Sequence, residues 1–111
     1  MRYLIDTHIL LWWLSNSPRL TTPIREAIAN PESLIFVSAA TVWEMSIKKA
    51  LGKLSVPNNL LKMLDIHRFE VLKISAEHAL KVGDLPDHHK DSFDRMLIAQ
   101  AQVEGLTLIK D

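Results

Sequence analysis

The chain has 111 residues, of which 48% are hydrophobic, and its 13 basic and 13 acidic side chains give a formal net charge of zero. These totals suit a single domain over residues 1–111 that can bury a core. They exclude a general basic field, so a nucleic-acid partner would have to be held by a local patch or through metal ions. The chain contains no cysteine, which excludes disulfides, thiolate metal sites and cysteine nucleophiles and fits a cytoplasmic protein.

The amino end, residues 1–14, is apolar enough to be considered as a signal or membrane segment. Asp6 and His8 interrupt it, and the apolar run that follows is far shorter than the span of about 20 residues that a membrane helix needs. We therefore expect a protein that does not associate with a membrane.

Short apolar runs alternate along the chain with segments of helical character. Runs that suit buried strands lie at residues 3–5, 34–37, 69–74 and 106–109. Helices are expected at residues 9–14, 22–30, 39–51, 58–67, 75–83 and 91–105. Strands separated by helices predict a three-layer α/β/α fold with a parallel central sheet built from right-handed crossovers.

Acidic residues follow the ends of the predicted strands. Asp6 lies directly after the first strand and Asp111 after the last one, and the helices expected from residues 39 and 91 begin at the same edge of the sheet. In open parallel sheets, ligands bind outside the carboxyl ends of the strands. The topology therefore draws the acidic residues toward one rim.

Each acidic residue also has an ordinary structural explanation. Asp6 can cap a helix, and Glu44 can pair with Lys48 four residues later. Glu44 nevertheless shares a helical stripe with Ala40, Ile47 and Leu51, where a side chain that faced only solvent would not be expected.

The two aspartates in the segment around residue 91 also differ in how well a structural role explains them. Asp91 is best explained as a helix cap, whereas Asp94 shares a stripe with Leu97 and Ala101. Asp111 can be a solvated chain end. His88 and His89 make a weak zinc site and are better explained as loop residues, one of which orients a carboxylate or a substrate phosphate.

Several carboxylates at one rim repel one another, so that one takes up a proton or a divalent cation neutralises them. Ligation by oxygen alone suits Mg²⁺ or Mn²⁺, which also accept phosphate oxygens. The chemistry that follows is metal-assisted phosphoryl transfer, in which no serine or cysteine nucleophile is needed.

Three runs together resemble the PIN domain family, and within it the branch of VapC-type toxins. They are Tyr-Leu-Ile-Asp-Thr at residues 3–7, Ser-Ala-Ala-Thr-Val-Trp-Glu-Met-Ser-Ile-Lys at 38–48 with Gly-Lys-Leu at 52–54, and His-Lys-Asp-Ser-Phe-Asp-Arg at 89–95 continuing to Ala101. The resemblance covers nearly the whole chain. It implies a ribonuclease with a Mg²⁺- or Mn²⁺-dependent acidic site, a homodimer, and an antitoxin that occludes the active site.

The resemblance also assigns residues. Asp6, Glu44 and Asp94 match the three best-placed catalytic and metal-binding acids of the family, and a fourth metal-binding acid is expected just after the last core strand, where Asp111 stands. Residues expected to hold a carboxylate or a substrate phosphate are Arg95, Lys48 and His89.

Two departures from the family pattern leave alternatives open. Ser92 stands where the branch often has proline, and residues 106–111 look one residue short of the usual ending, with the usual last helix and edge strand missing from the expected fold. Either Asp111 is the fourth acid, shifted along the chain, or that acid is lost. The alternative function is a catalytically impaired PIN-like module that dimerises or associates with an antitoxin. A phosphoacceptor receiver domain is disfavoured, because residues 69–74 are followed by Ser-Ala-Glu rather than by an acceptor aspartate.

Overall fold

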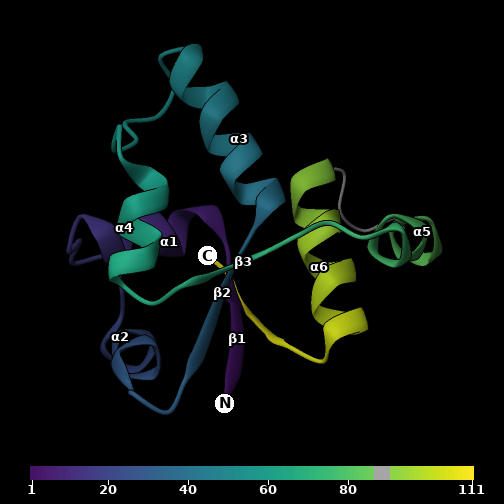
Figure 1. Cartoon of the computed structure of the whole chain (residues 1–111), viewed down its shortest axis with the longest axis horizontal. Helices are drawn as coiled ribbons and strands as arrows, with labels where there is room; N and C mark the ends of the chain where they lie inside the picture. Colours follow the sequence, from purple (N-terminus) through teal and green to yellow (C-terminus); the bar gives the residue numbers. More distant parts are fainter. Residues whose placement is uncertain (87–90) are drawn as a thin grey trace.

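The computed structural model describes residues 1–86 and 91–111. The chain forms a four-stranded sheet, and Figure 1 shows helices on both sides of the strands. In chain order the elements are β1 (Arg2–Ile5), α1 (Thr7–Leu14), α2 (Thr22–Ala29), β2 (Leu34–Ser38), α3 (Ala39–Ala50), α4 (Leu60–Ile66), β3 (Glu70–Leu72), α5 (Ala76–Asp84), α6 (Ser92–Glu104) and β4 (Thr107–Ile109).

The strands form one sheet in the order β3-β2-β1-β4, and all three pairings are parallel. The register places Leu4 beside Phe36 on β2, and Ile5 beside both Val37 and Ile109. Because successive residues of a strand face opposite sides of the sheet, the two sets of apolar side chains cover opposite faces. The predicted parallel sheet is confirmed.

Helices bury both faces of the sheet. In Figure 1, α1, α2 and α4 lie on one side of the strands and α5 and α6 on the other, while α3 extends beyond the carboxyl ends of the strands. One core cluster joins Ile5 to Ile9 and Met45, and a second joins Leu4 to Leu97. The three-layer α/β/α architecture expected from the sequence is therefore confirmed.

The edge strand β3 is shorter than predicted. The strand expected at residues 69–74 has only three residues, because it pairs with β2 alone and its last residue, Leu72, lies opposite Ser38, where β2 ends. Ser75 then caps α5 by accepting a hydrogen bond from the backbone N–H of His78. The apolar residues 9–14 lie in a helix that begins at Thr7 and is capped by Asp6, as the position of Asp6 after the first strand predicts.

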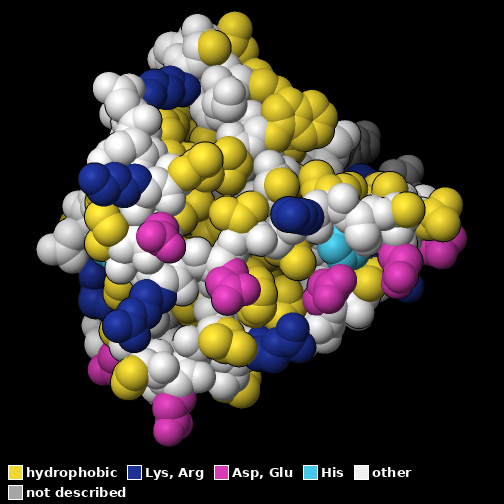
Figure 2. Space-filling view, in the orientation of Figure 1, with side chains coloured by type: hydrophobic (Ala, Val, Ile, Leu, Met, Phe, Trp, Pro, Cys, Tyr) yellow, Lys and Arg dark blue, Asp and Glu magenta, His cyan; other side chains and the backbone are white. Residues whose placement is uncertain are grey.

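Part of the surface is apolar. Trp43 and Ile47 on α3 and Leu51, the residue that follows α3, lie at intervals of four residues and are 59%, 39% and 63% exposed. Hydrophobic side chains gather over α3 and toward α6 in Figure 2, with Lys, Arg, Asp and Glu scattered over the rest of that face. No helix within the described parts of the chain is long and apolar enough to cross a membrane.

Candidate active site

Asp6 lies at the carboxyl end of β1, where the chain turns into α1. Its Oδ1 accepts a hydrogen bond from the backbone N–H of Ile9, and its Oδ2 accepts one from the backbone N–H of Asp111, both at 2.9 Å. The carboxylate thus joins the start of α1 to the segment that follows β4. Only 7% of Asp6 is exposed, so this tie is made inside the protein.

Glu44 faces the same edge from α3, which begins directly after β2. Its Oε1 accepts a hydrogen bond from Oγ1 of Thr7 and its Oε2 accepts one from Nζ of Lys48, both at 2.6 Å. The side chain of Glu44 is 12% exposed and that of Lys48 is 39% exposed. The ion pair expected at this spacing is confirmed, and it lies in a cavity rather than on an open helix face.

The first turn of α6 contributes two more carboxylates. Oδ1 of Asp91 accepts hydrogen bonds from the backbone N–H groups of Phe93 and Asp94, at 2.8 and 3.2 Å, which confirms Asp91 as the helix cap. Asp94 is half-buried in the first turn. Both anions are favoured there by the exposed amides and by the macrodipole of the helix.

Asp111 completes the group from the segment after β4. Its side chain is 50% exposed, and its Oδ2 lies 3.4 Å from Nδ1 of His8. A cavity of about 290 Å³ lies between these segments. Its lining residues are Asp6, Thr7, His8, Glu44, Lys48, Asp91, Asp94, Lys110 and Asp111.

The electrostatics of the cavity follow from burial and from mutual repulsion. Burial is the main reason that the pKa of Asp6 is raised above its usual range; the two backbone N–H bonds and His8 oppose the shift, and the charge of Asp111 adds to it. The pKa of Lys48 is also raised, first by its hydrogen bond to Glu44 and further by the charges of Glu44, Asp91 and Asp94. The Lys48 ammonium therefore lies in the field of carboxylates from two helices.

The donor set fits a hard divalent cation, because five carboxylates line one cavity and oxygen is the ligand that Mg²⁺ and Mn²⁺ prefer. Within residues 1–86 and 91–111, no three acidic or histidine side chains are already gathered closely enough to hold a metal ion. Both oxygens of Glu44 are engaged by Thr7 and Lys48. A cation held by Glu44 would therefore share a carboxylate oxygen with the Thr7 hydroxyl or the Lys48 ammonium.

The structure brings most of the predicted site residues together. Those that line the cavity are Asp6, Glu44, Lys48, Asp94 and Asp111. Arg95 does not line it: its guanidinium donates hydrogen bonds to the carbonyl oxygens of Val82 and Pro86, at 2.8 and 3.1 Å. His89 lies outside the described residues, as does His88.

Thr7, His8 and Lys110 also line the cavity, and none of them is among the site residues expected from the sequence. Thr7 and His8 follow Asp6 directly, and Lys110 precedes Asp111, so adjacency to an assigned acid was the available signal. The contact between Thr7 and Glu44 spans 37 positions and has no local signature.

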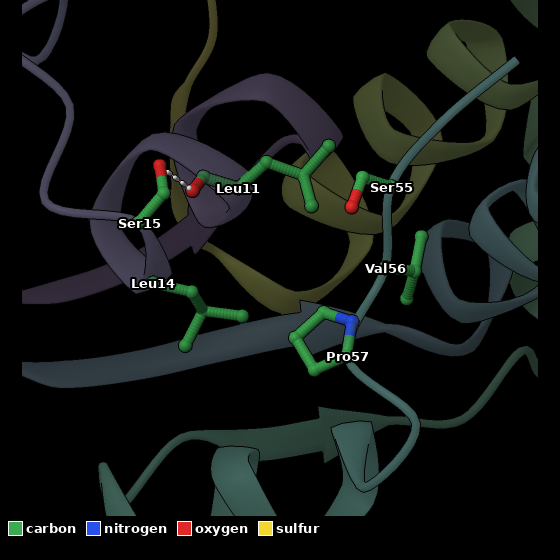
Figure 3. Close-up of a pocket in the computed structure, with 6 residues that line it drawn as sticks. All are labelled: Leu11, Leu14, Ser15, Ser55, Val56 and Pro57. Atoms are coloured by element: carbon green, nitrogen blue, oxygen red, sulfur yellow. Dashed lines mark hydrogen bonds between the residues drawn. The ribbon is translucent and has the colours of Figure 1, made fainter.

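Two other hollows have an apolar character. One, of about 420 Å³, lies between α1 and the segment that leads to α4, and Figure 3 shows the side chains of Leu11, Val56 and Pro57 around it. The other, of about 250 Å³, lies between α3, α5 and α6 beside the rings of Trp43 and Phe93, whose centroids are 5.1 Å apart. Among the residues that the structure describes, no ionisable side chain lines either hollow, and neither lining suits hydrolytic chemistry.

The sequence and the fold of this chain are similar to those of known proteins. A family model described as PIN domain matches residues 3–111. Solved structures with a similar fold include a DNA-bound VapBC from Salmonella typhimurium, with a TM-score of 0.70 and 22% sequence identity over 99% of this chain and 86% of that chain. VapBC2 from Rickettsia felis, bound to a DNA fragment from its promoter, has a TM-score of 0.68 and 20% identity over 97% of this chain and 86% of that chain. A toxin–antitoxin complex from Klebsiella pneumoniae has a TM-score of 0.63 and 23% identity over 96% of this chain and 82% of that chain. The comparison with curated proteins gives no significant match.

Proposed function

Since this chain belongs to the PIN domain family, we propose that it is a metal-dependent endoribonuclease, the toxin of a type II toxin–antitoxin pair, which hydrolyses RNA phosphodiester bonds. One observation carries the proposal. Five carboxylates from four separate segments of the chain line a single cavity at the carboxyl edge of the parallel sheet. Packing alone gives no reason to place so many like charges together, whereas a divalent cation does.

In this proposal Asp6, Glu44 and Asp94 are the catalytic carboxylates that hold Mg²⁺ or Mn²⁺, and Asp111 is the fourth metal-binding acid. When bound, the metal supplies an activated water, a polarised phosphate and a stabilised leaving oxygen. The placement of Asp111 supports its role, because its own backbone N–H is bonded to Asp6 and its side chain lines the cavity.

The neighbouring polar residues orient these acids and the substrate. Thr7 fixes Glu44 through the bond to Oε1, so that the carboxylate cannot turn freely. Lys48 and Lys110 bring positive charge to the cavity, where a phosphate of the RNA would lie. Arg95 does not line the cavity; its bonds to the carbonyl oxygens of Val82 and Pro86 tie α6 to the end of α5.

We also propose an antitoxin partner, a homodimeric state and a cytoplasmic location. The support is that the similar solved structures are toxin–antitoxin assemblies, and that this chain exposes Trp43, Ile47 and Leu51 on one side of α3. An apolar hollow lies beside Trp43. Exposed apolar patches of this kind are typical of surfaces that bind another protein.

The test is cleavage of a mixed-sequence RNA with added Mg²⁺ or Mn²⁺ by the wild type and by Asp94→Asn. We expect the variant to lose about 10²-fold or more in rate, because a metal ligand and its charge are removed. Asp65→Asn on α4 is the matched control, since Asp65 is exposed and does not line the cavity. Equal activity of wild type and Asp94→Asn would overturn the assignment.

A second candidate is a catalytically impaired module that associates with an antitoxin. It is favoured by the engagement of both Glu44 oxygens and by the lack of three gathered ligands among the described residues. Calorimetry separates the two candidates. Absence of heat on adding Mn²⁺, together with retained binding of a peptide from the antitoxin, supports the second candidate.

A further inference from the structure

The cavity contains a cation of its own. Nζ of Lys48 lies 2.6 Å from Oε2 of Glu44, on the side of the carboxylate opposite to Thr7. Glu44 is held between a hydroxyl on α1 and an ammonium on α3, and its side chain is 12% exposed. This differs from an ordinary pair on an open helix surface, where both side chains are solvated and the pair contributes little.

The ammonium also faces carboxylates of another helix. Lys48 lines the cavity together with Asp91 and Asp94 at the start of α6. The charges of these two aspartates stabilise the protonated lysine, in addition to the larger effect of the Glu44 hydrogen bond. Lys48 therefore neutralises part of the negative charge that a divalent cation would otherwise neutralise.

We propose that Lys48 is the internal counter-ion of the acidic cavity, which holds Glu44 in the metal-free protein and leaves it when a divalent cation binds. The inference rests on the proposed function, since it takes the cavity to be the metal site. A carboxylate oxygen can accept a hydrogen bond and bind a cation at the same time, but an ammonium 2.6 Å from Oε2 repels a divalent cation on the same carboxylate. The lysine bond is the one to break, because Lys48 is 39% exposed and its long stem can turn toward solvent, whereas Thr7 is 7% exposed and fixed in the first turn of α1.

Two consequences follow. Metal affinity in the wild type is lowered by the competition with Lys48, because both cations use Glu44 and because a positive charge in the cavity repels a second one. Once displaced, the ammonium stays tethered at the edge of the cavity. In the metal-free protein Lys48 positions the carboxylate of Glu44. After the exchange its ammonium lies on the solvent side of the site, where it can bind a phosphate oxygen.

The experiment measures Mn²⁺ binding by electron paramagnetic resonance and calorimetry, without RNA, at constant ionic strength. We expect Lys48→Met to bind Mn²⁺ about three- to tenfold more tightly than the wild type. Lys48→Arg keeps a cation on the same helix turn and should bind Mn²⁺ no more tightly than the wild type. Lys49→Met is the matched control, since it removes the same charge from the neighbouring position, where Nζ bonds to Oδ1 of Asn58 and does not line the cavity.

A second measurement uses the wild-type protein, without a substitution at Lys48. In the wild type, the ¹³Cε signal of Lys48 should shift when Mg²⁺ is added to saturation, while that of Lys49 should stay in place. Any one of four results would overturn the inference. The Mn²⁺ affinity of Lys48→Met could equal that of the wild type, or Lys49→Met could gain as much affinity as Lys48→Met. The Lys48 signal could stay in place when Mg²⁺ is added, or no variant could bind Mn²⁺. Mn²⁺ binding that behaves as expected while RNA stays uncleaved would overturn the proposed function alone.

Discussion

The hydrogen bond from Thr7 to Glu44 offers the sharpest test of how the site is held together. Thr7→Val removes the hydroxyl and keeps the size and branching of the side chain. The bond is 2.6 Å long, its acceptor is a carboxylate, and the two residues are 7% exposed (Thr7) and 12% exposed at the side chain (Glu44). A bond to a charged group contributes about 1.5–3 kcal/mol. For a chain of 111 residues this corresponds to a fall in Tm of about 6–15 °C.

The assay is thermal and denaturant unfolding of the metal-free protein, with Thr41→Val as the matched control. Thr41 is 1% exposed in α3, and within the described structure its Oγ1 has no hydrogen-bond partner, so the same substitution there should be neutral or stabilising. In a Glu44→Gln background, Thr7→Val should lower stability by only about 1 kcal/mol, because the acceptor is then uncharged. Equal stability of the two valine variants would refute the reasoning.

Three further predictions concern stability. The difference in unfolding free energy between Asp6→Asn and the wild type, measured in EDTA, should move in favour of the variant as the pH rises. The pH interval runs from below the usual range of aspartate pKa values up to 7. The raised pKa of Asp6 means that its ionised form disfavours the fold, and this penalty is absent below the unfolded-state pKa and complete above the folded-state pKa; a difference independent of pH contradicts it. Glu104→Ala should lower the unfolding free energy by about 1.5–3 kcal/mol and leave RNA cleavage unchanged, because it removes the partner, at 2.7 Å, of the 1% exposed His78 ring between α5 and α6; loss of cleavage by a folded variant would contradict it. Gly105→Ala should lower the unfolding free energy by about 1 kcal/mol, purely through the backbone, since φ is +67° and an added Cβ meets nothing within 4 Å; an unchanged denaturation midpoint would count against it.

The fold was predictable because its signals are local. Ser38, Ser75 and Asp91 each cap the helix that the sequence assigned to them, through hydrogen bonds of their own side chains. Apolar runs bounded by such caps are sufficient to place the strands, and strands separated by helices imply a parallel sheet. The length of β3 was not predictable in this way, because it depends on pairing with β2 alone at the edge of the sheet.

The location of the candidate site could be predicted from the sequence, but the arrangement of its side chains could not. Topology brings Asp6, Glu44 and Asp94 to the carboxyl edge, and all three line one cavity. The partners of each oxygen depend on contacts between distant segments, such as the bond from the Asp111 backbone to Asp6 across 105 positions. Hydrophobic period and capping rules describe neighbours within one helix, so they carry no information on such contacts.

The structural and functional explanations of these acids are compatible, and their coexistence has a physical reason. A carboxylate that caps a helix or pairs with a lysine is already held in one orientation by bonds that partly offset its burial. Asp6 shows the limit of this compensation, since burial still raises its pKa although two backbone N–H groups bond to it. The other carboxylates of the cavity have positive charge beside them, since Lys48 bonds to Glu44 and lies in the field of Asp91 and Asp94. The cavity therefore folds with the Lys48 ammonium in place, and its proposed chemistry depends on exchanging that ammonium for a divalent cation.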